Sequence, residues 1–200
     1  MNKKEHTERE YKWEAFDRND FFVFLSALKN SVKIISSEDK LLEDFYFDSP
    51  DKYFSSSKTS CRIRKEKNSF TLTLKKNSPL ENGLASREEK ETRLKAHDLK
   101  AALKEAQGIL GKKLLQVFSF NNERTVYRVK SEFAAEVCFD AFTINIKQGK
   151  LAMKEIEMEF KSGDINAFHR AARQLTDGAG LKFAEVSKVK TALAALEFYK

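Results

Sequence analysis

The sequence has few of the residues that mark fibrous, disordered or disulfide-rich proteins. Only 7 glycines and 2 prolines occur in 200 residues, which excludes a collagen-like or Pro/Gly-rich disordered chain. Two cysteines, Cys61 and Cys138, are too few for a disulfide framework, and their strand-like neighbours predict buried free thiols. The 3 histidines are scattered without the spacing of zinc ligands. These shortages exclude a cysteine- or histidine-based metal centre.

Long hydrophobic runs are also missing. The densest apolar run, residues 21–25, is far too short to cross a membrane. The first ten residues lack the apolar segment of a secretory signal. Neither a GxSxG nucleophile elbow nor a glycine-rich phosphate loop occurs. We therefore expect a cytoplasmic protein that has no membrane partner.

Charge of both signs is abundant. The chain has 37 Lys and Arg residues against 30 Asp and Glu residues, a net charge of +7 at pH 7. Hydrophobic residues make up 41% of the chain and include 17 phenylalanines, which is enough for the core of a single domain over residues 1–200. A simple nucleic-acid-binding arm would not contain so many carboxylates, so the placement of the two signs decides the interpretation.

Side-chain alternation predicts a protein built mainly of antiparallel strands. We expect about nine strands and four helices, with residues 32–36 and 41–48, 114–120 and 123–130, and 134–139 and 143–147 as separate strands. Residues 51–60 read as a polar loop. The helices begin after the capping residues Asp20, Asp98, Asp164 and Ser187. This pattern favours an α+β fold, mainly antiparallel β, in which a barrel or curved sheet is flanked by helices.

Like charges follow single faces of several expected strands. In residues 155–160 three glutamates alternate with Ile156, Met158 and Phe160, and Arg62 and Arg64 share one face of another strand. Neighbouring like charges repel, and a solvated face usually mixes the two signs. The separation predicts a divalent metal beside the acids and a polyanion beside the bases. Around residues 87–93 both faces are polar, so alternation does not decide which face points inward.

Ordered motifs along the chain resemble those of a known family. Residues 8–12 read ExExK, 62–64 read RxR, 71–75 end in a lysine, 87–91 read RxExE, and 155–159 read ExExE. Arg124, the acidic residues Glu136 and Asp140, and the pair Ser187-Lys188 follow in the same order. Together they resemble the CYTH superfamily, the triphosphate tunnel metalloenzymes, over residues 8 to about 196. Asn122 departs from the pattern, because a basic residue is expected there.

The resemblance implies a closed barrel of about eight antiparallel strands with a charged interior. Arginine forks and lysine ammonium groups suit phosphate oxygens, and carboxylates suit Mg²⁺ or Mn²⁺. The implied phosphate-binding residues are Lys12, Arg62, Arg64, Lys75, Arg87, Arg124 and Lys188. The implied metal ligands are Glu8, Glu10, Glu157 and Glu159, and a second site or a water would use Glu89, Glu91, Asp140 or Glu155. Glu159 or Glu91 would align or deprotonate the attacking water, and Lys12 is a third catalytic candidate.

Three functions stay open at this point. The first is hydrolysis of inorganic triphosphate, thiamine triphosphate or nucleoside triphosphates by in-line attack on phosphorus. The second is a class IV-type adenylate cyclase, which would release pyrophosphate from ATP. The third, ranked last because the glutamates would repel a nucleic-acid backbone, is a non-catalytic binder of polyphosphate or RNA. The expected partner is a small triphosphate molecule, nucleic acid being unlikely, and the expected assembly is a monomer or homodimer.

Overall fold

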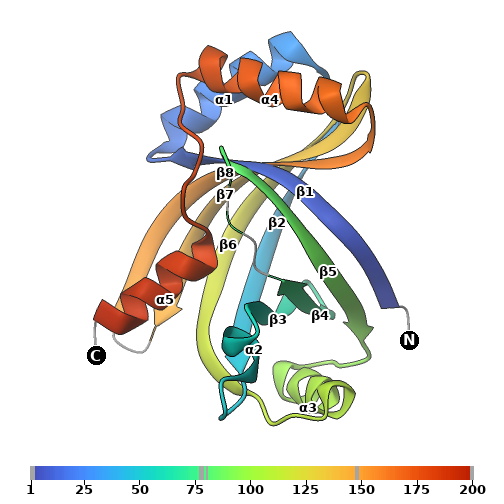
Figure 1. The fold of residues 1–200 in the computed structure, drawn as a ribbon, viewed down its shortest axis with the longest axis vertical. Helices are drawn as coiled ribbons and strands as arrows, with labels where there is room; N and C mark the ends of the chain where they lie inside the picture. The colour runs from blue at the N-terminus through green and yellow to red at the C-terminus, as the bar shows by residue number, and fades with distance from the viewer. Residues whose placement is uncertain (1–2, 77–78, 80, 147–148, 199–200) are drawn as a thin grey trace.

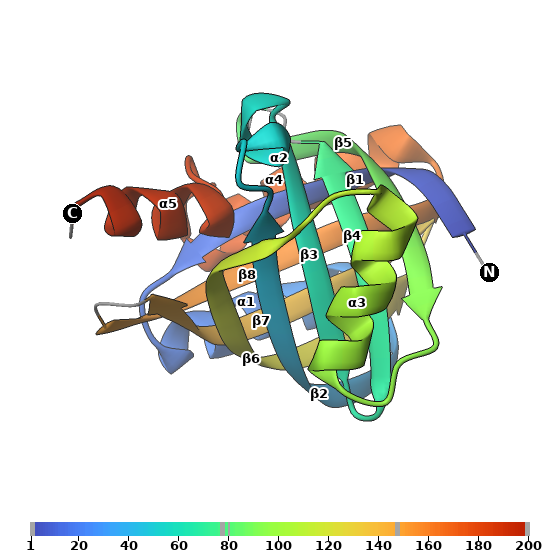
Figure 2. The ribbon, with the colours of Figure 1, turned by 90° about the horizontal axis from the view of Figure 1, so that it is seen from below.

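A closed antiparallel β-barrel forms most of the molecule. The computed structural model describes residues 3–76, 79, 81–146 and 149–198. The barrel strands are β1 (Lys3–Ala15), β2 (Lys33–Asp48), β3 (Thr59–Glu66), β4 (Ser69–Lys76), β5 (Leu84–Leu94), β6 (Leu115–Lys130), β7 (Phe133–Ile146) and β8 (Gly149–Gly163). The helices are α1 (Arg18–Ser31), α2 (Tyr53–Ser56), α3 (Leu99–Leu110), α4 (Ile165–Ala179) and α5 (Lys188–Phe198). Figures 1 and 2 show the barrel from the side and from below.

The strands follow one another around the barrel in the order β1-β5-β4-β3-β2-β6-β7-β8. All the pairs are antiparallel, and β1 pairs with β5 through its first part and with β8 through its last part. Glu8 lies opposite Arg87 of β5, and Glu10 lies opposite Glu159 of β8. The expected closed barrel is therefore confirmed, and β1 is the strand that closes it.

Several predicted strand boundaries were wrong. Segments 32–36 and 41–48 form the single strand β2, and β6 and β7 each join two expected strands in the same way. β2 has register shifts between Ile34 and Ser36 and between Tyr46 and Phe47, but the expected break was at residues 37–40, where the run Ser-Glu-Asp-Lys contains no apolar side chain to show alternation. In the described residues the chain forms eight strands and five helices, and the extra helix, α2, lies inside the expected loop 51–60.

Helix α1 begins three residues earlier than expected. Asp17 is its N-cap, and the Asp17 carboxylate accepts hydrogen bonds from the backbone N–H groups of Asn19 and Asp20. The Asp20 carboxylate in turn accepts from the backbone N–H of Asp17, which completes a capping box. Asp20 therefore takes the third helical position instead of the cap. The caps expected at Asp98 and Asp164 are confirmed.

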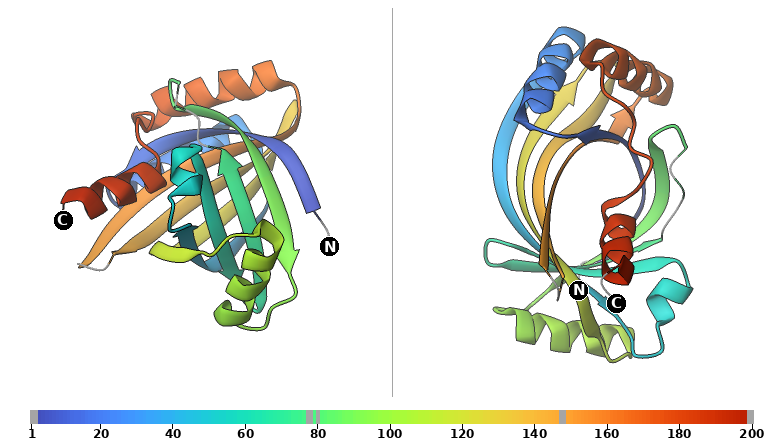
Figure 3. Two further views of the ribbon diagram at one scale, coloured as in Figure 1. Left: turned by 60° about the horizontal axis from the view of Figure 1, so that its bottom comes forward. Right: turned by 90° about the vertical axis from the view of Figure 1, so that its left-hand side faces the viewer.

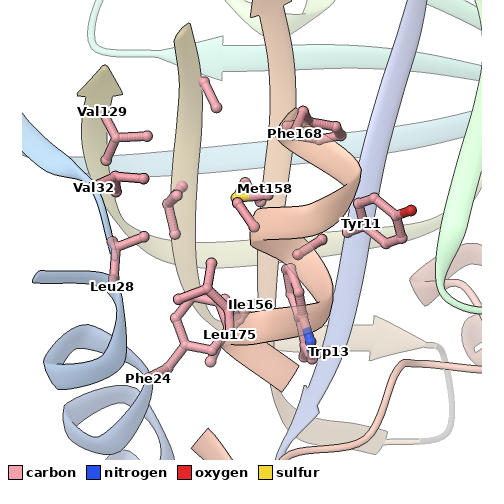
Figure 4. Packing of buried hydrophobic residues seen from close by; sticks show 14 of the residues in the cluster. Tyr11, Trp13, Phe24, Leu28, Val32, Val129, Ile156, Met158, Phe168 and Leu175 are labelled. Atoms are coloured by element: carbon pink, nitrogen blue, oxygen red, sulfur yellow. The ribbon is translucent and has the colours of Figure 1, made fainter. Parts of the chain in front are cut away.

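The largest hydrophobic core lies between the barrel and the layer formed by α1 and α4 (Figures 1 and 4). Trp13 of β1 is fully buried, its ring packs on Phe24 of α1 at 4.8 Å, and its indole N–H donates to the Thr176 hydroxyl. Ile156 and Met158 of β8 point into the same cluster. The outer faces of residues 11–15 and 156–160 are thus apolar, which leaves Glu10, Lys12, Glu157 and Glu159 on the inner face.

Two smaller clusters complete the packing. Ala102 and Ala106 of α3 pack on the outer faces of β3 and β4, where Ile63 and Leu72 alternate with the inward-facing polar residues. Ala192 of α5 packs on an aromatic cluster from β2, β6 and β7. The right-hand view of Figure 3 shows α5 beside one opening of the barrel. No helix in the described part of the chain is long and apolar enough to span a bilayer.

Candidate active site

The inner faces of the strands enclose a polar cavity of about 250 Å³. The inward positions are every second residue of each strand, so the cavity wall contains the charged half of each alternating pattern. In β5 this resolves the ambiguity of the sequence: Arg87 and Glu89 are buried and Glu91 is half-buried, all three on the cavity wall, whereas Glu88 and Lys90 are exposed outside.

The structure brings most of the predicted site residues into this one cavity. All seven predicted phosphate-binding residues line it, and so do the four predicted metal ligands. The lining residues from the predicted set are Glu8, Glu10, Lys12, Arg62, Arg64, Lys75, Arg87, Glu89, Glu91, Arg124, Glu157, Glu159 and Lys188. Asp140 and Glu155 are not part of the lining. They are buried behind it and contact the cations that line the cavity.

Carboxylates form a row across three neighbouring strands. Glu159 of β8 lies between Glu10 of β1 and Glu136 of β7 in the strand register, and all three line the cavity. Lys161 binds the Glu159 carboxylate at 2.7 Å and the Glu136 carboxylate at 3.1 Å. Burial raises the pKa of Glu159 to about 7; Lys161 opposes the shift, and Glu8 and Glu10 add to it. The row therefore places three carboxyl groups side by side on the wall.

Lys12 of β1 neutralises carboxylates of β1 and β8. Lys12 contacts Glu155 at 3.1 Å and Glu10 at 3.2 Å, and it also pairs with Glu157. Burial disfavours the ammonium form of Lys12, but these three carboxylates outweigh burial and raise its pKa well above the usual value. Burial also acts against ionised Glu157, yet the neighbouring cations, Lys12 first, hold its pKa well below the usual range. Lys12 and Glu157 therefore form a charged pair.

Further cations on the cavity wall come from β4, β5 and β6. Arg87 pairs with Glu10 and lies 3.3 Å from Glu8, and Lys75 binds Glu8 at 2.6 Å. Arg124 donates to Asp140 in a two-point contact at 2.5 and 2.6 Å and to Glu157 at 2.6 Å. Their positive groups gather on one cavity and suit an anion with several negative charges.

Asp44 of β2 is a site residue that the sequence analysis missed. It is only 3% exposed, lines the cavity and binds Arg64 through both carboxylate oxygens, at 2.6 and 2.7 Å. Its inward neighbours along β2, Leu42 and Tyr46, are not charged, so no alternating charge pattern marked it.

Other lining residues extend known patterns. Lys161 continues the inward face of residues 155–159 by one more step, a signal the sequence contained. Lys4 and His6 continue the inward face of β1 in the other direction, and Lys40 comes from β2. Asn122, at the position where a base was expected, donates to Asp140 at 3.0 Å.

Cys138 also lies on the cavity wall. Burial raises the pKa of its thiol to about 12, which leaves it a poor nucleophile.

Aromatic side chains line one end of the same cavity. Tyr46, Phe120 and Phe142 contribute rings there, and Ser187, Lys188 and Val189 at the start of α5 lie beside them. Lys188 binds Asp140 and reaches Glu157 at 3.1 Å. The start of α5 therefore contributes a cation, Lys188, to the cavity wall.

The donor set fits a hard divalent cation in chemistry. Glu10, Glu159 and Glu136 offer only oxygen ligands, the donor type that Mg²⁺ and Mn²⁺ prefer. Among the residues that the structure describes, no three His, Cys, Asp or Glu side chains stand close enough together to hold a metal ion. The carboxylates instead contact lysines and arginines, so a bound ion would take over part of that charge neutralisation.

Comparison with known proteins places this architecture in a family. The family model described as CYTH domain matches residues 6–193. The inorganic triphosphatase of Haemophilus influenzae is 30% identical over 165 residues, which cover 78% of this chain and 46% of that protein. The chain thus spans about half the length of this curated relative.

Solved structures share the fold at low sequence identity. A protein from Hippeastrum, described as a candidate adenylyl cyclase with a dominant triphosphatase activity, superposes with a TM-score of 0.68 at 17% identity, covering 94% of this chain and 96% of that one. A candidate adenylate cyclase from Bacillus halodurans gives a TM-score of 0.63 at 20% identity, over 94% of this chain and 97% of the other. The closed barrel, its charged inner faces and the family match over residues 6–193 agree with one another. This chain therefore belongs to the CYTH domain family.

Proposed function

We propose that this chain is a metal-dependent triphosphatase that hydrolyses a phosphoanhydride bond of a small triphosphate molecule inside the barrel, with residues 1–200 acting as one domain. One observation carries the proposal: cations from seven strands and α5 share a single cavity with a row of carboxylates from β1, β7 and β8. A triphosphate brings several negative charges in a short length, and Mg²⁺ or Mn²⁺ suits the carboxylates. The similarity to an inorganic triphosphatase adds support.

Substrate binding would fall to the basic side chains. Arg62, Arg64 and Lys75 come from the adjacent strands β3 and β4, and Arg87 and Arg124 come from β5 and β6. Together they would bind the phosphate oxygens and hold the triphosphate extended, so that water can attack phosphorus in line with the leaving group. Lys12, which is buried, and Lys188, which is half-buried, would neutralise charge that develops on the phosphate in the transition state.

The carboxylate row would hold the metal and the water. Glu10, Glu159 and Glu136 would bind the ion, with Glu8 and Glu157 beside them. A bound Mg²⁺ or Mn²⁺ supplies charge neutralisation at the phosphate oxygens and lowers the pKa of a bound water. Glu159 or Glu91, both on the cavity wall, would orient or deprotonate the attacking water.

The test is phosphate release from inorganic triphosphate, ATP and thiamine triphosphate with Mg²⁺, with Mn²⁺ and with EDTA. We expect orthophosphate from at least one of these substrates with metal and none with EDTA. Binding of triphosphate without turnover under every metal condition would contradict the proposal, and it would point to the non-catalytic polyphosphate or RNA binder.

Adenylate cyclisation is a second candidate, favoured by one observation. Tyr46, Phe120 and Phe142 give one end of the cavity an aromatic wall on which an adenine ring could stack. A phosphorus NMR time course on ATP separates the two reactions. Cyclic AMP with pyrophosphate would support the cyclase, whereas ADP with orthophosphate would support the triphosphatase.

A further inference from the structure

Asp44 lies between two arginines at the centre of the cavity wall. Its carboxylate accepts hydrogen bonds from Nε and Nη2 of Arg64 at 2.6 and 2.7 Å, and Nη1 of Arg62 lies 3.6 Å from the same carboxylate. The register explains the contact, because Asp44 of β2 is paired directly with Arg64 of β3, and Arg62 is paired with Tyr46, two residues further along β2.

This contact fixes the orientation of both guanidinium groups. The two-point contact uses the Nε hydrogen and one Nη2 hydrogen of Arg64, which leaves the second Nη2 hydrogen and both Nη1 hydrogens as donors that Asp44 does not use. Arg62 is held on its other side by Thr73, whose hydroxyl accepts from Nη2 at 3.3 Å. Without Asp44 the two guanidinium groups would repel each other, and each long side chain would sample several rotamers.

The surroundings argue against other roles for Asp44. Both carboxylate oxygens already accept charged hydrogen bonds from Arg64, and Arg62 lies nearby, so the charge of Asp44 is neutralised by the two arginines. Asp140 shows the same construction on β7, where it holds Arg124 by two contacts and also binds Lys188. Each of these aspartates thus contacts two of the predicted phosphate-binding cations.

We propose that Asp44 is a positioning residue for phosphate binding: it orients Arg62 and Arg64 so that their remaining N–H groups face the substrate. The inference rests on the proposed function, since it takes these arginines to bind phosphate. It assigns Asp44 no contact with the substrate. Its effect passes through the two arginines.

The direction in which triphosphate affinity changes in Asp44→Asn separates this role from a purely electrostatic one. Asp44→Asn removes a negative charge beside an anion site, so simple Coulomb attraction predicts tighter triphosphate binding. Positioning predicts weaker binding, because the arginines lose their fixed geometry; misplacement of this kind costs about 10- to 100-fold. Calorimetric titration with inorganic triphosphate in EDTA measures the dissociation constant without turnover. Equal or tighter binding in Asp44→Asn overturns the proposal.

Glu43→Gln is the matched control. Glu43 is the next residue on β2, lies on the opposite face and pairs with Lys65 at 2.5 Å, both side chains being partly exposed. We expect this variant to bind triphosphate within about twofold of the wild type. A loss equal to that of Asp44→Asn would mean that any acid-to-amide change in β2 weakens binding, and the proposal would fall.

Combining substitutions tests whether the effect of Asp44 on triphosphate binding passes through Arg62 and Arg64. In the background of Arg62→Ala and Arg64→Ala, adding Asp44→Asn should weaken binding by less than about twofold, because the groups it orients are gone. A full additional loss in this background would overturn the proposal. Asp44→Glu keeps the charge and moves the carboxylate, so it should also weaken binding; it serves if Asp44→Asn does not fold, as judged by circular dichroism and thermal unfolding.

The outcomes distinguish this inference from the proposed function. Wild-type protein that binds and hydrolyses triphosphate while Asp44→Asn binds equally well disproves the positioning role alone. Wild-type protein that binds without hydrolysis disproves the triphosphatase alone, and the variants still test Asp44. Wild-type protein that binds no triphosphate disproves both.

Discussion

Glu10 of β1 and Glu159 of β8 are direct cross-strand neighbours on the inner face of the barrel. Like charges placed opposite each other on adjacent strands are destabilising, and in this protein Glu136 extends the row on the next strand. Lys161 offsets part of this repulsion at Glu159 and Glu136. A divalent cation would offset more of it, which leads to the first prediction.

Removing Glu10 or Glu159 should abolish metal binding at the carboxylate row. We expect Glu10→Gln and Glu159→Gln each to weaken Mn²⁺ binding at least about tenfold, measured by calorimetry, and to lower triphosphatase activity in parallel. Glu88→Gln is the control, since Glu88 lies on the outer face of β5 and its side chain is 72% exposed. Unchanged Mn²⁺ affinity in both cavity variants would show that the metal binds elsewhere.

The neighbouring residues Lys75 and Lys76 should differ sharply in their effect on activity. Lys75 lines the cavity and contacts Glu8 at 2.6 Å, whereas the Lys76 side chain is 66% exposed outside. Lys75→Ala should cost about 2–4 kcal/mol of transition-state stabilisation in kcat/KM on inorganic triphosphate. Lys76→Ala should stay within about twofold of the wild type. Equal effects at the two positions would indicate general electrostatic attraction instead of a specific phosphate contact.

Stability should fall with rising pH because of Glu159. Burial raises the pKa of Glu159 in the folded protein to about 7 from an ordinary value of 4.5, so between these values the folded state binds more protons than the unfolded state. Its contribution is therefore full below pH about 4.5 and is lost as the pH rises through about 7. Urea unfolding at pH 4.5 and pH 8, without metal, should show a smaller decline for Glu159→Gln than for the wild type. Identical declines would contradict this assignment.

Gly83 should tolerate substitution less well than Gly111. Both have positive φ angles, +78° and +62°, but a Cβ at Gly83 would overlap the Phe183 ring, whereas nothing lies within 4 Å of a Cβ at Gly111. Gly111→Ala should cost about 1 kcal/mol from backbone strain, and Gly83→Ala about 1–3 kcal/mol more from overpacking. Thermal or urea unfolding of the two variants measures the difference. Equal losses would mean that Phe183 moves aside freely.

Alternation allowed much of the barrel wall to be predicted from the sequence. Residues 155–159 place glutamates and apolar side chains on opposite faces, and the structure has Glu157 on the cavity wall and Ile156 in the core. Around Arg87 the pattern failed, because the outer face of β5 is charged too and alternation then has no contrast. Only pairing with β1, a contact between distant segments, decides that Arg87 faces inward.

Other features depended on contacts that no local pattern encodes. Asp44 has uncharged inward neighbours on its own strand, so only its pairing with Arg64 reveals its place in the cavity. The cap of α1 was misassigned because Asp17 and Asp20 are both good capping residues, and the capping box uses both. The splitting of β2 followed from the polar run at residues 37–40, which has no apolar side chain to show alternation although the strand continues through it.

The double pairing of β1 has a consequence for how the barrel closes. Lys12 and Glu157 are separated by 145 positions in sequence, and they meet only when β8 reaches β1. The cavity wall between these two strands therefore depends on a contact between distant segments, and barrels that close through such contacts fold slowly compared with proteins rich in local contacts.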